Sequence, residues 1–123
     1  MEFHSGGCLC GASRYRFSGA PRFSILCFCG DCQKATGGGH APQLAVDTRG
    51  MSYLGPVRTW RSTSDRGNEV NLGFCRNCGS PLFKTSEMAP HLTFIFAGSL
   101  DEPDLFAEPR RVFEGSRLPW DTY

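Results

Sequence analysis

Seven cysteines, spaced as two metal-binding sets, constrain this chain of 123 residues more than any other feature. One pair, Cys8-Leu9-Cys10, lies near the start of the chain, and a second pair, Cys75-Arg76-Asn77-Cys78, lies in its second half. A closer group of three, Cys27-Phe28-Cys29-Gly30-Asp31-Cys32, lies between them. Four thiolates make a closed tetrahedral zinc site, whereas three leave one position open. The spacing therefore predicts one metal site that only holds the fold and a second that also does chemistry.

The two outer pairs predict the closed site. In each pair the second cysteine is followed by a glycine, Gly11 or Gly79, which permits the tight turn that lets both sulfur atoms face one ion. A single pair cannot fill a tetrahedral site, so each pair needs the other. The alternative is that some of these cysteines are ordinary buried thiols. The expected ligands of one structural zinc are Cys8, Cys10, Cys75 and Cys78.

The middle group predicts the open site. Three thiolates so close together repel one another unless a cation neutralises them, and with zinc each would be deprotonated at neutral pH. No fourth cysteine remains, so the last position is open to water or to a substrate thiol, whose pKa a bound zinc would lower. We therefore expect Cys27, Cys29 and Cys32 to hold a second, catalytic zinc.

Alternatives for the middle group remain open. A protein side chain could fill the fourth position, which would make the group a second structural site. The site could also be labile, either empty or oxidised to a disulfide that includes Cys32. The candidate fourth ligands are His4, His40, His91 and Asp31.

Composition excludes several functions. Net charge is +1, from 13 basic and 12 acidic residues, with no basic run that would indicate nucleic-acid binding. No apolar stretch approaches the ~20 residues that cross a bilayer, and the first residues do not resemble a secretory signal. An odd number of cysteines cannot form a complete disulfide framework. These observations favour a cytoplasmic metal-binding protein without a membrane or nucleic-acid partner.

Hydrophobic patterning predicts a mostly β fold, a single domain over residues 1–123 with small antiparallel sheets around the zinc site. Short alternating runs separated by turn residues every 8 to 12 positions indicate the strands. Only Asp31 to Thr36 predicts a helical turn, ended by the glycines at 37–39. The strands are expected within 12–18, 23–28, 43–46, 57–63, 70–74 and 92–96.

The last segment, 101–123, is interrupted by prolines and predicts mostly irregular structure. Its apolar side chains would let it dock on the sheet, and Trp60 is likewise expected to cover the core rather than to line a pocket. The docking residues are Phe106, Val112, Phe113, Leu118 and Trp120.

Other residues are weaker candidates for function. His40 follows three glycines close to the middle cysteines and could move a proton, although a polar loop role is more common. Three arginines, Arg58, Arg61 and Arg66, could bind carboxylates of a substrate, or could simply be solvated.

The cysteine motifs and their flanking residues resemble the glutathione-dependent formaldehyde-activating enzyme family, to which centromere protein V also belongs. The resemblance extends from Gly6 to Trp120 and rests on the order and spacing of five segments. These are Gly6-Gly7-Cys8-Leu9-Cys10-Gly11, Cys27-x-Cys29-x-x-Cys32, Thr36-Gly37, Phe74-Cys75-x-x-Cys78-Gly79-Ser80-x-Leu82 and Gly98-Ser99-Leu100-Asp101-x-Pro103.

The resemblance implies a β-tent fold with the same division between a structural and a catalytic zinc. It also implies the activity of a carbon-sulfur lyase that forms S-hydroxymethylglutathione from glutathione and formaldehyde. The family commonly has histidine where this chain has Phe28, which removes a polar neighbour from the middle cysteines.

We therefore expect a zinc-dependent carbon-sulfur lyase that acts on a thiol adduct of a small aldehyde, with glutathione or a related thiol as partner. The alternatives are a binding module in which zinc only stabilises the fold, and a sensor of zinc or thiol oxidation. The sequence leaves the aldehyde, the thiol and the oligomeric state open.

Overall fold

Two β-sheets and one short helix make up the computed structural model, which describes residues 2–122. The smaller sheet has the order β1-β2-β5, from β1 (Phe3–Gly7), β2 (Arg14–Ser18) and β5 (Met51–Leu54). The larger sheet has the order β10-β3-β4-β9-β8-β7-β6. Its strands are β3 (Phe23–Cys27), β4 (Ala41–Asp47), β6 (Val57–Thr63), β7 (Glu69–Cys75), β8 (Pro81–Ser86), β9 (Leu92–Phe96) and β10 (Arg110–Val112).

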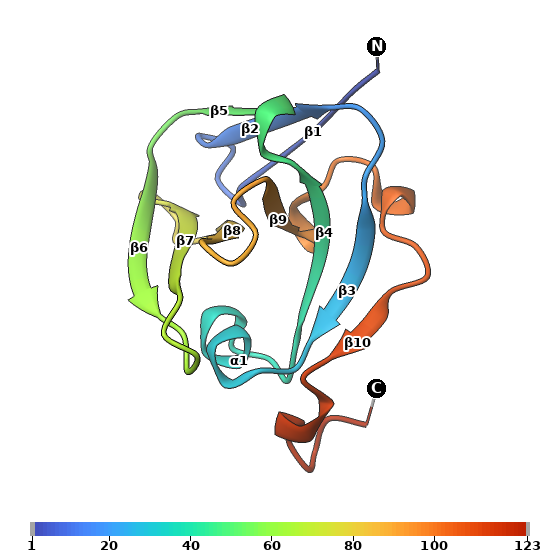
Figure 1. Ribbon diagram of the computed structural model, residues 1–123. Coiled ribbons are helices and arrows are strands. Elements are labelled where there is room, and N and C mark those ends of the chain that lie inside the picture. Colours follow the sequence, from blue (N-terminus) through green and yellow to red (C-terminus); the bar gives the residue numbers. More distant parts are fainter. Residues whose placement is uncertain (1, 123) are drawn as a thin grey trace.

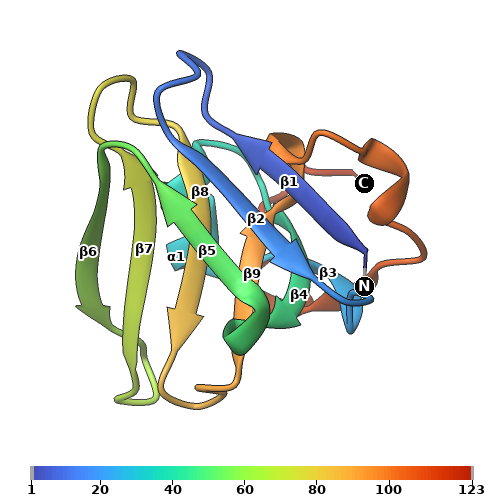
Figure 2. The same cartoon turned by 90° about the horizontal axis from the view of Figure 1, so that it is seen from above.

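All strand pairs are antiparallel except β10 with β3. The larger sheet curves from β6 round to β10, and the helix α1 (Gly30–Thr36) lies at one end of it (Figure 1). Seen from above, the smaller sheet crosses over β8, β9 and β4 (Figure 2). The predicted mostly β architecture is confirmed. Within residues 2–122 no helix is long and apolar enough to cross a bilayer.

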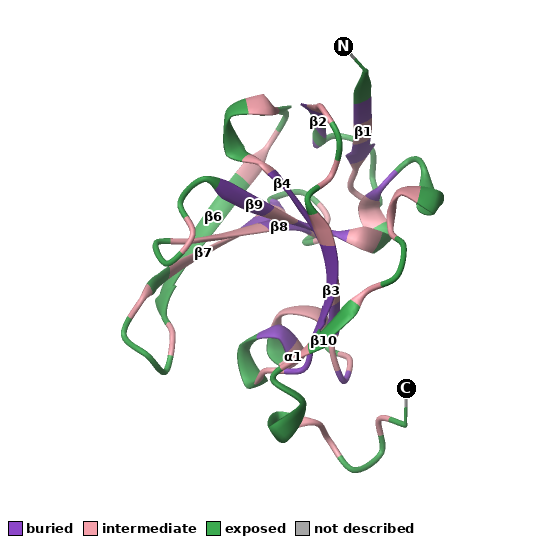
Figure 3. Cartoon of the chain, turned by 45° about the vertical axis from the view of Figure 1, so that its right-hand side comes forward, coloured by how far each residue is buried: buried purple, intermediate pink, exposed green. Residues whose placement is uncertain are grey.

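The core lies between the two sheets and continues toward α1. Tyr15 and Phe17 of β2 point inward as their alternation predicts, and they join side chains from β4, β8 and β9. A second apolar cluster lies under α1 and includes Cys27, Cys32 and Phe96. Burial is therefore concentrated in β3, β4 and β9, whereas β6 is an exposed edge strand (Figure 3).

Four short 3-10 turns complete the described part of the chain and shape its connections. The second lies in the motif Gly98-Ser99-Leu100-Asp101, which links the two sheets. There the Ser99 hydroxyl is 2.7 Å from the Tyr15 hydroxyl, and Leu100 forms an isolated bridge with Gly6. The turns span Thr48–Gly50, Ala97–Ser99, Pro103–Leu105 and Glu114–Ser116.

Asp101 carries the polar part of this connection. Its carboxylate accepts hydrogen bonds from Ser5 Oγ at 2.7 Å and from the guanidinium of Arg14. Hydrogen bonds from Arg14 and then Ser5 lower the pKa of Asp101. The Gly98-Ser99-Leu100-Asp101 motif thus holds the hairpin that carries Cys8 and Cys10.

Four strands were not predicted: β1, β5, β8 and β10. β1 reads Phe-His-Ser-Gly-Gly and has no apolar alternation, because backbone pairing with β2 rather than side-chain burial defines it. Within the last segment, Arg110–Val112 extends the sheet beside β3 instead of remaining irregular.

The tail docks through fewer side chains than predicted. Phe106 and Val112 pack against the two core clusters. Phe113 and Trp120 are 53% and 66% exposed, because the chain leaves the sheet after β10 and turns outward. The prediction that Trp60 covers the core is also wrong, since it lies on the edge strand β6 and is 67% exposed.

We predict that Asp101→Asn lowers the free energy of unfolding by about 1 kcal/mol at neutral pH. Because the folded-state pKa of Asp101 is lowered, its stabilisation is complete above the pKa of an unfolded aspartate and is lost as pH falls through the folded value. The difference between variant and wild type should therefore shrink in acid. Urea unfolding across a pH series measures it, with Asp65→Asn in an exposed turn as control. A difference that persists unchanged in acid would contradict this assignment.

Candidate functional site

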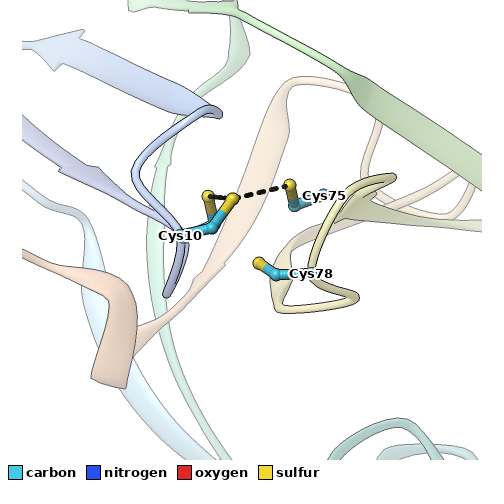
Figure 4. Close-up of side chains that lie close together, drawn as sticks. Cys10, Cys75 and Cys78 are labelled. Atoms are coloured by element: carbon cyan, nitrogen blue, oxygen red, sulfur yellow. Dashed lines mark hydrogen bonds between the residues drawn. The ribbon is translucent and has the colours of Figure 1, made fainter.

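Four cysteine sulfur atoms meet where two distant turns come together. The Sγ atoms of Cys8, Cys10, Cys75 and Cys78, called the tetrad below, all lie within 4.8 Å of one another. Cys10 Sγ is 3.6 Å from Cys8 Sγ and 3.9 Å from Cys75 Sγ. A tetrahedral zinc with sulfur ligands at ~2.3 Å would separate those sulfur atoms by about 3.8 Å, so the tetrad fits zinc. Figure 4 shows Cys10, Cys75 and Cys78 facing one another.

Backbone geometry explains why these turns present their sulfur atoms. The first pair lies between β1 and β2. In the second pair, Cys75 ends β7 and Cys78 lies in the turn that follows it. Gly11 and Gly79 adopt φ values of +81° and +80°, which a residue with a side chain rarely adopts. The glycines after the cysteine pairs therefore have the role that the sequence predicts.

A serine connects the two turns beside the tetrad. The Ser80 hydroxyl accepts a hydrogen bond from the Leu9 amide at 3.0 Å and lies 3.2 Å from Cys78 Sγ. Hydrogen bonds from the Ser80 hydroxyl and then its amide lower the pKa of Cys78 to about 5. The Ser13 amide donates to Cys8 Sγ at 3.2 Å. These donors favour the thiolate, which is the form that binds a metal.

The second sulfur group is Cys27, Cys29 and Cys32, called the triplet below, with Sγ atoms also within 4.8 Å of one another. Cys27 ends β3, Cys29 caps the N-terminus of α1, and Cys32 lies in its first turn. The Cys29 sulfur accepts a hydrogen bond from the Cys32 amide at 3.3 Å. Cys27 and Cys32 are only 1% and 2% exposed. Among residues 2–122, no histidine, aspartate or glutamate joins this group as a fourth donor.

Contacts between the three thiols give them different pKa values. Hydrogen bonds from Cys27 and then Cys32 lower the pKa of Cys29 to about 2. Contact with the Cys29 sulfur in turn raises the pKa of Cys27, and contact with Cys27 and then Cys29 raises that of Cys32. One thiol ionises readily and the other two resist. Full ionisation of the triplet therefore requires a cation, so the group fits a metal as well as the tetrad does.

Two residues beside the triplet were missed by the sequence analysis. Gln43, on β4, donates from Nε2 to Cys32 Sγ at 3.5 Å, and its buried Oε1 has no partner in the described part of the chain. Lys84, on β8, places Nζ 3.8 Å from the same sulfur. No spacing rule connects positions 43 and 84 to a cysteine at 32. The only available signal was a charged residue among the β-forming residues that follow Cys78-Gly79-Ser80-Pro81.

The two sulfur groups border different cavities. A larger cavity of about 590 Å³ lies against the tetrad and is lined by Cys8, Ser80 and Ser99, among others. A smaller one of about 280 Å³ lies against the triplet and is lined by Cys32, Lys84 and apolar side chains that include Trp60. Phe96 lines both. The smaller cavity thus borders the sulfur group that has no fourth donor among the described residues.

The three histidines that were candidate fourth ligands do not join the triplet. His4 is buried and pairs with Glu2 and Glu102, at 3.1 and 2.9 Å. The His40 ring donates from Nδ1 to Asp121 Oδ2 at 2.8 Å. His91 is exposed. None of the three lines either cavity.

The charged candidates divide into two groups. Asp31 is exposed and lines the smaller cavity. Arg58, Arg61 and Arg66 are exposed and line neither cavity, and Arg61 pairs with Glu69 at 3.7 Å. The cations that border the smaller cavity are Lys34 and Lys84 instead.

Phe28, which lies between the first two cysteines of the triplet, is a packing residue. Its side chain is fully buried, with the His40 ring centroid at 4.9 Å and the Arg117 guanidinium over its ring at 4.8 Å. The Phe28 amide also donates to the Val112 carbonyl at 3.0 Å. Phe28 therefore connects the triplet segment to the C-terminal segment.

Comparisons with known proteins agree with this geometry. The family model for glutathione-dependent formaldehyde-activating enzymes matches residues 3–116. A search of curated proteins finds no match. A crystal structure of a Rhodobacter sphaeroides protein, determined in a structural genomics programme, superposes with a TM-score of 0.67 at 16% identity. The alignment covers 87% of this chain and 98% of the other, which shows a shared fold. The chain belongs to the glutathione-dependent formaldehyde-activating enzyme family.

Proposed function

We propose that this protein is a zinc-dependent carbon-sulfur lyase that forms or cleaves the adduct of a thiol with a small aldehyde. Family membership supports a glutathione-dependent, formaldehyde-activating type of function. We assign the reaction to the triplet and the structural role to the tetrad. Glutathione and formaldehyde are the proposed substrates.

One observation carries this proposal. The triplet offers three sulfur donors, the described residues add no fourth, and Cys32 opens onto a cavity of about 280 Å³. A site closed by protein ligands would exclude a substrate, whereas a site one donor short can take up a thiol sulfur. The tetrad already has four donors and needs no further ligand.

The proposed reaction is an addition without redox change. The thiol loses its proton, its sulfur forms a bond to the carbonyl carbon, and the π electron pair of the carbonyl moves to oxygen. That oxygen then takes up a proton, which gives the hydroxymethyl thioether. The reverse sequence cleaves the carbon-sulfur bond and returns thiol and aldehyde.

Residues of the chain would hold the Cys32 sulfur in place and shield the aldehyde from water. When bound at the triplet, zinc supplies a Lewis acid that favours ionisation of an incoming thiol. Gln43 fixes the Cys32 sulfur through its amide, and Trp60, Leu72 and Phe96 line the space in which the aldehyde would meet it. Because His40 lines neither cavity, we assign the proton on the product oxygen to water rather than to this histidine.

We predict about two zinc ions per chain in protein purified with reductant and zinc, because two sulfur groups fit the metal. Mass spectrometry of metals on the desalted protein measures the ratio. Added glutathione should perturb the environment of one ion only, as X-ray absorption at the zinc edge would detect. A ratio of one that persists under these conditions would contradict a metal at the triplet.

Two serine substitutions separate the roles of the sulfur groups. Cys29→Ser should leave the fold intact, because serine also caps helices well, and should abolish turnover. Cys78→Ser should unfold the domain, because it removes a ligand whose metal binding contributes folding energy. Circular dichroism reports folding, and exchange NMR with labelled formaldehyde and glutathione reports turnover.

The outcome distinguishes an enzyme from a scaffold held together by zinc. If Cys29→Ser unfolds the chain as Cys78→Ser does, the triplet is structural and the proposed activity fails. If Cys29→Ser folds and retains full turnover, the reaction does not depend on the triplet.

A further inference from the structure

The cavity beside the triplet combines a sulfur group, a cation and an apolar wall. It lies between α1 and strands β6, β7 and β8, whose residues line it together with Phe96 of β9. Trp60 and Leu72 contribute the apolar surface, and Cys32 and Lys84 contribute the polar end. A ligand that extends from the triplet along this cavity therefore meets Lys84 first.

Lys84 is poised to bind an anion. Its Nζ lies 3.8 Å from Cys32 Sγ and 5.5 Å from the centroid of the Phe94 ring. It forms no ion pair with a carboxylate of residues 2–122. A half-buried ammonium without a carboxylate partner binds an incoming carboxylate more strongly than a solvated surface lysine would.

The other charged residues at the cavity also favour Lys84 as the residue that binds an anion. Lys34 and Asp31 also line it, both on exposed positions of α1, and their charges offset each other. Lys84 is therefore the charged residue of this lining that lies beside the triplet, with its Nζ 3.8 Å from Cys32 Sγ. A ligand whose carboxylate lies close to its thiol matches this arrangement, because Cys32 and Lys84 lie at the same end of the cavity.

We propose that Lys84 is a specificity-determining residue that binds the carboxylate of the thiol substrate, so that the site selects acidic thiols over neutral or cationic ones. This proposal rests on the proposed function, because it requires the substrate sulfur to reach the triplet. It identifies the chemical class of the thiol substrate and the residue that recognises it.

The test compares three small thiols that differ in charge: 3-mercaptopropionate, 2-mercaptoethanol and cysteamine. Calorimetric titration of the zinc-loaded protein gives the affinity for each. Wild type should bind 3-mercaptopropionate about tenfold more tightly than 2-mercaptoethanol, as expected for one charge-assisted hydrogen bond. Cysteamine should bind most weakly.

Three variants assign the effect to Lys84. K84Q should bind 3-mercaptopropionate about tenfold more weakly and 2-mercaptoethanol as wild type does. K84R should restore most of the preference, because it keeps the charge. K34Q removes the same charge from the exposed rim of the same cavity and should change the preference much less. Metal content measured in parallel should stay at the wild-type value.

Other results would overturn the proposal. Equal weakening of all three thiols in K84Q, or loss of zinc from it, would mean that Lys84 only balances the charge of the triplet. An equal effect of K34Q would mean that the cavity attracts anions without a defined residue. If thiols bind and react without discrimination by charge, the role of Lys84 fails and the proposed lyase stands. If no thiol binds the zinc-loaded protein, both fail together.

Discussion

The meeting of four sulfur atoms from two separate turns is the constraint on which the rest of this structure depends. The turn between β1 and β2 belongs to the small sheet, and the turn after β7 belongs to the large one. Ionised thiols at 3.6 to 3.9 Å repel one another, so the arrangement requires a shared cation or retained protons. The contacts of Asp101 and Ser99 hold the same hairpin from its other side.

The two sulfur groups differ in how deeply their cysteines are buried. In the tetrad, Cys10 is exposed, and Leu9 beside it is 90% exposed. In the triplet, Cys27 and Cys32 belong to the apolar cluster under α1. A group with four protein donors needs no protection from water. In the proposed reaction an apolar surrounding would favour the triplet, because water would compete with the substrate for the open position and would weaken electrostatic contacts.

The residues that would tune the triplet come from the sheet rather than from the cysteine motif. Gln43 and Lys84 lie on β4 and β8, which both pair with β9, and both reach Cys32. On the other side, Phe28 contacts His40 and Arg117, which ties the motif to the C-terminal segment. The surroundings of the three cysteines can thus change without a change in the cysteine motif, because Gln43 and Lys84 come from other strands.

Much of this architecture follows from local sequence. Two cysteine pairs each followed by glycine predicted the turns of the tetrad, and alternation at Tyr15 and Phe17 predicted an inward face of β2. The helix was predicted within one residue, because its polar segment ends at Gly37 in the left-handed conformation. β1 and β10 could not be predicted, because each is defined by its backbone partner rather than by its own pattern.

The sequence by itself determined the mostly β class, the grouping of seven cysteines into four and three, and the family. The reason is that turn geometry and the spacing of metal ligands depend on only a few neighbouring residues. Only the tertiary structure decided which cavity adjoins the triplet, that Trp60 borders it instead of covering the core, and that Lys84 approaches Cys32. Those relations join residues about 50 positions apart through strand order and sheet curvature, which no local pattern encodes.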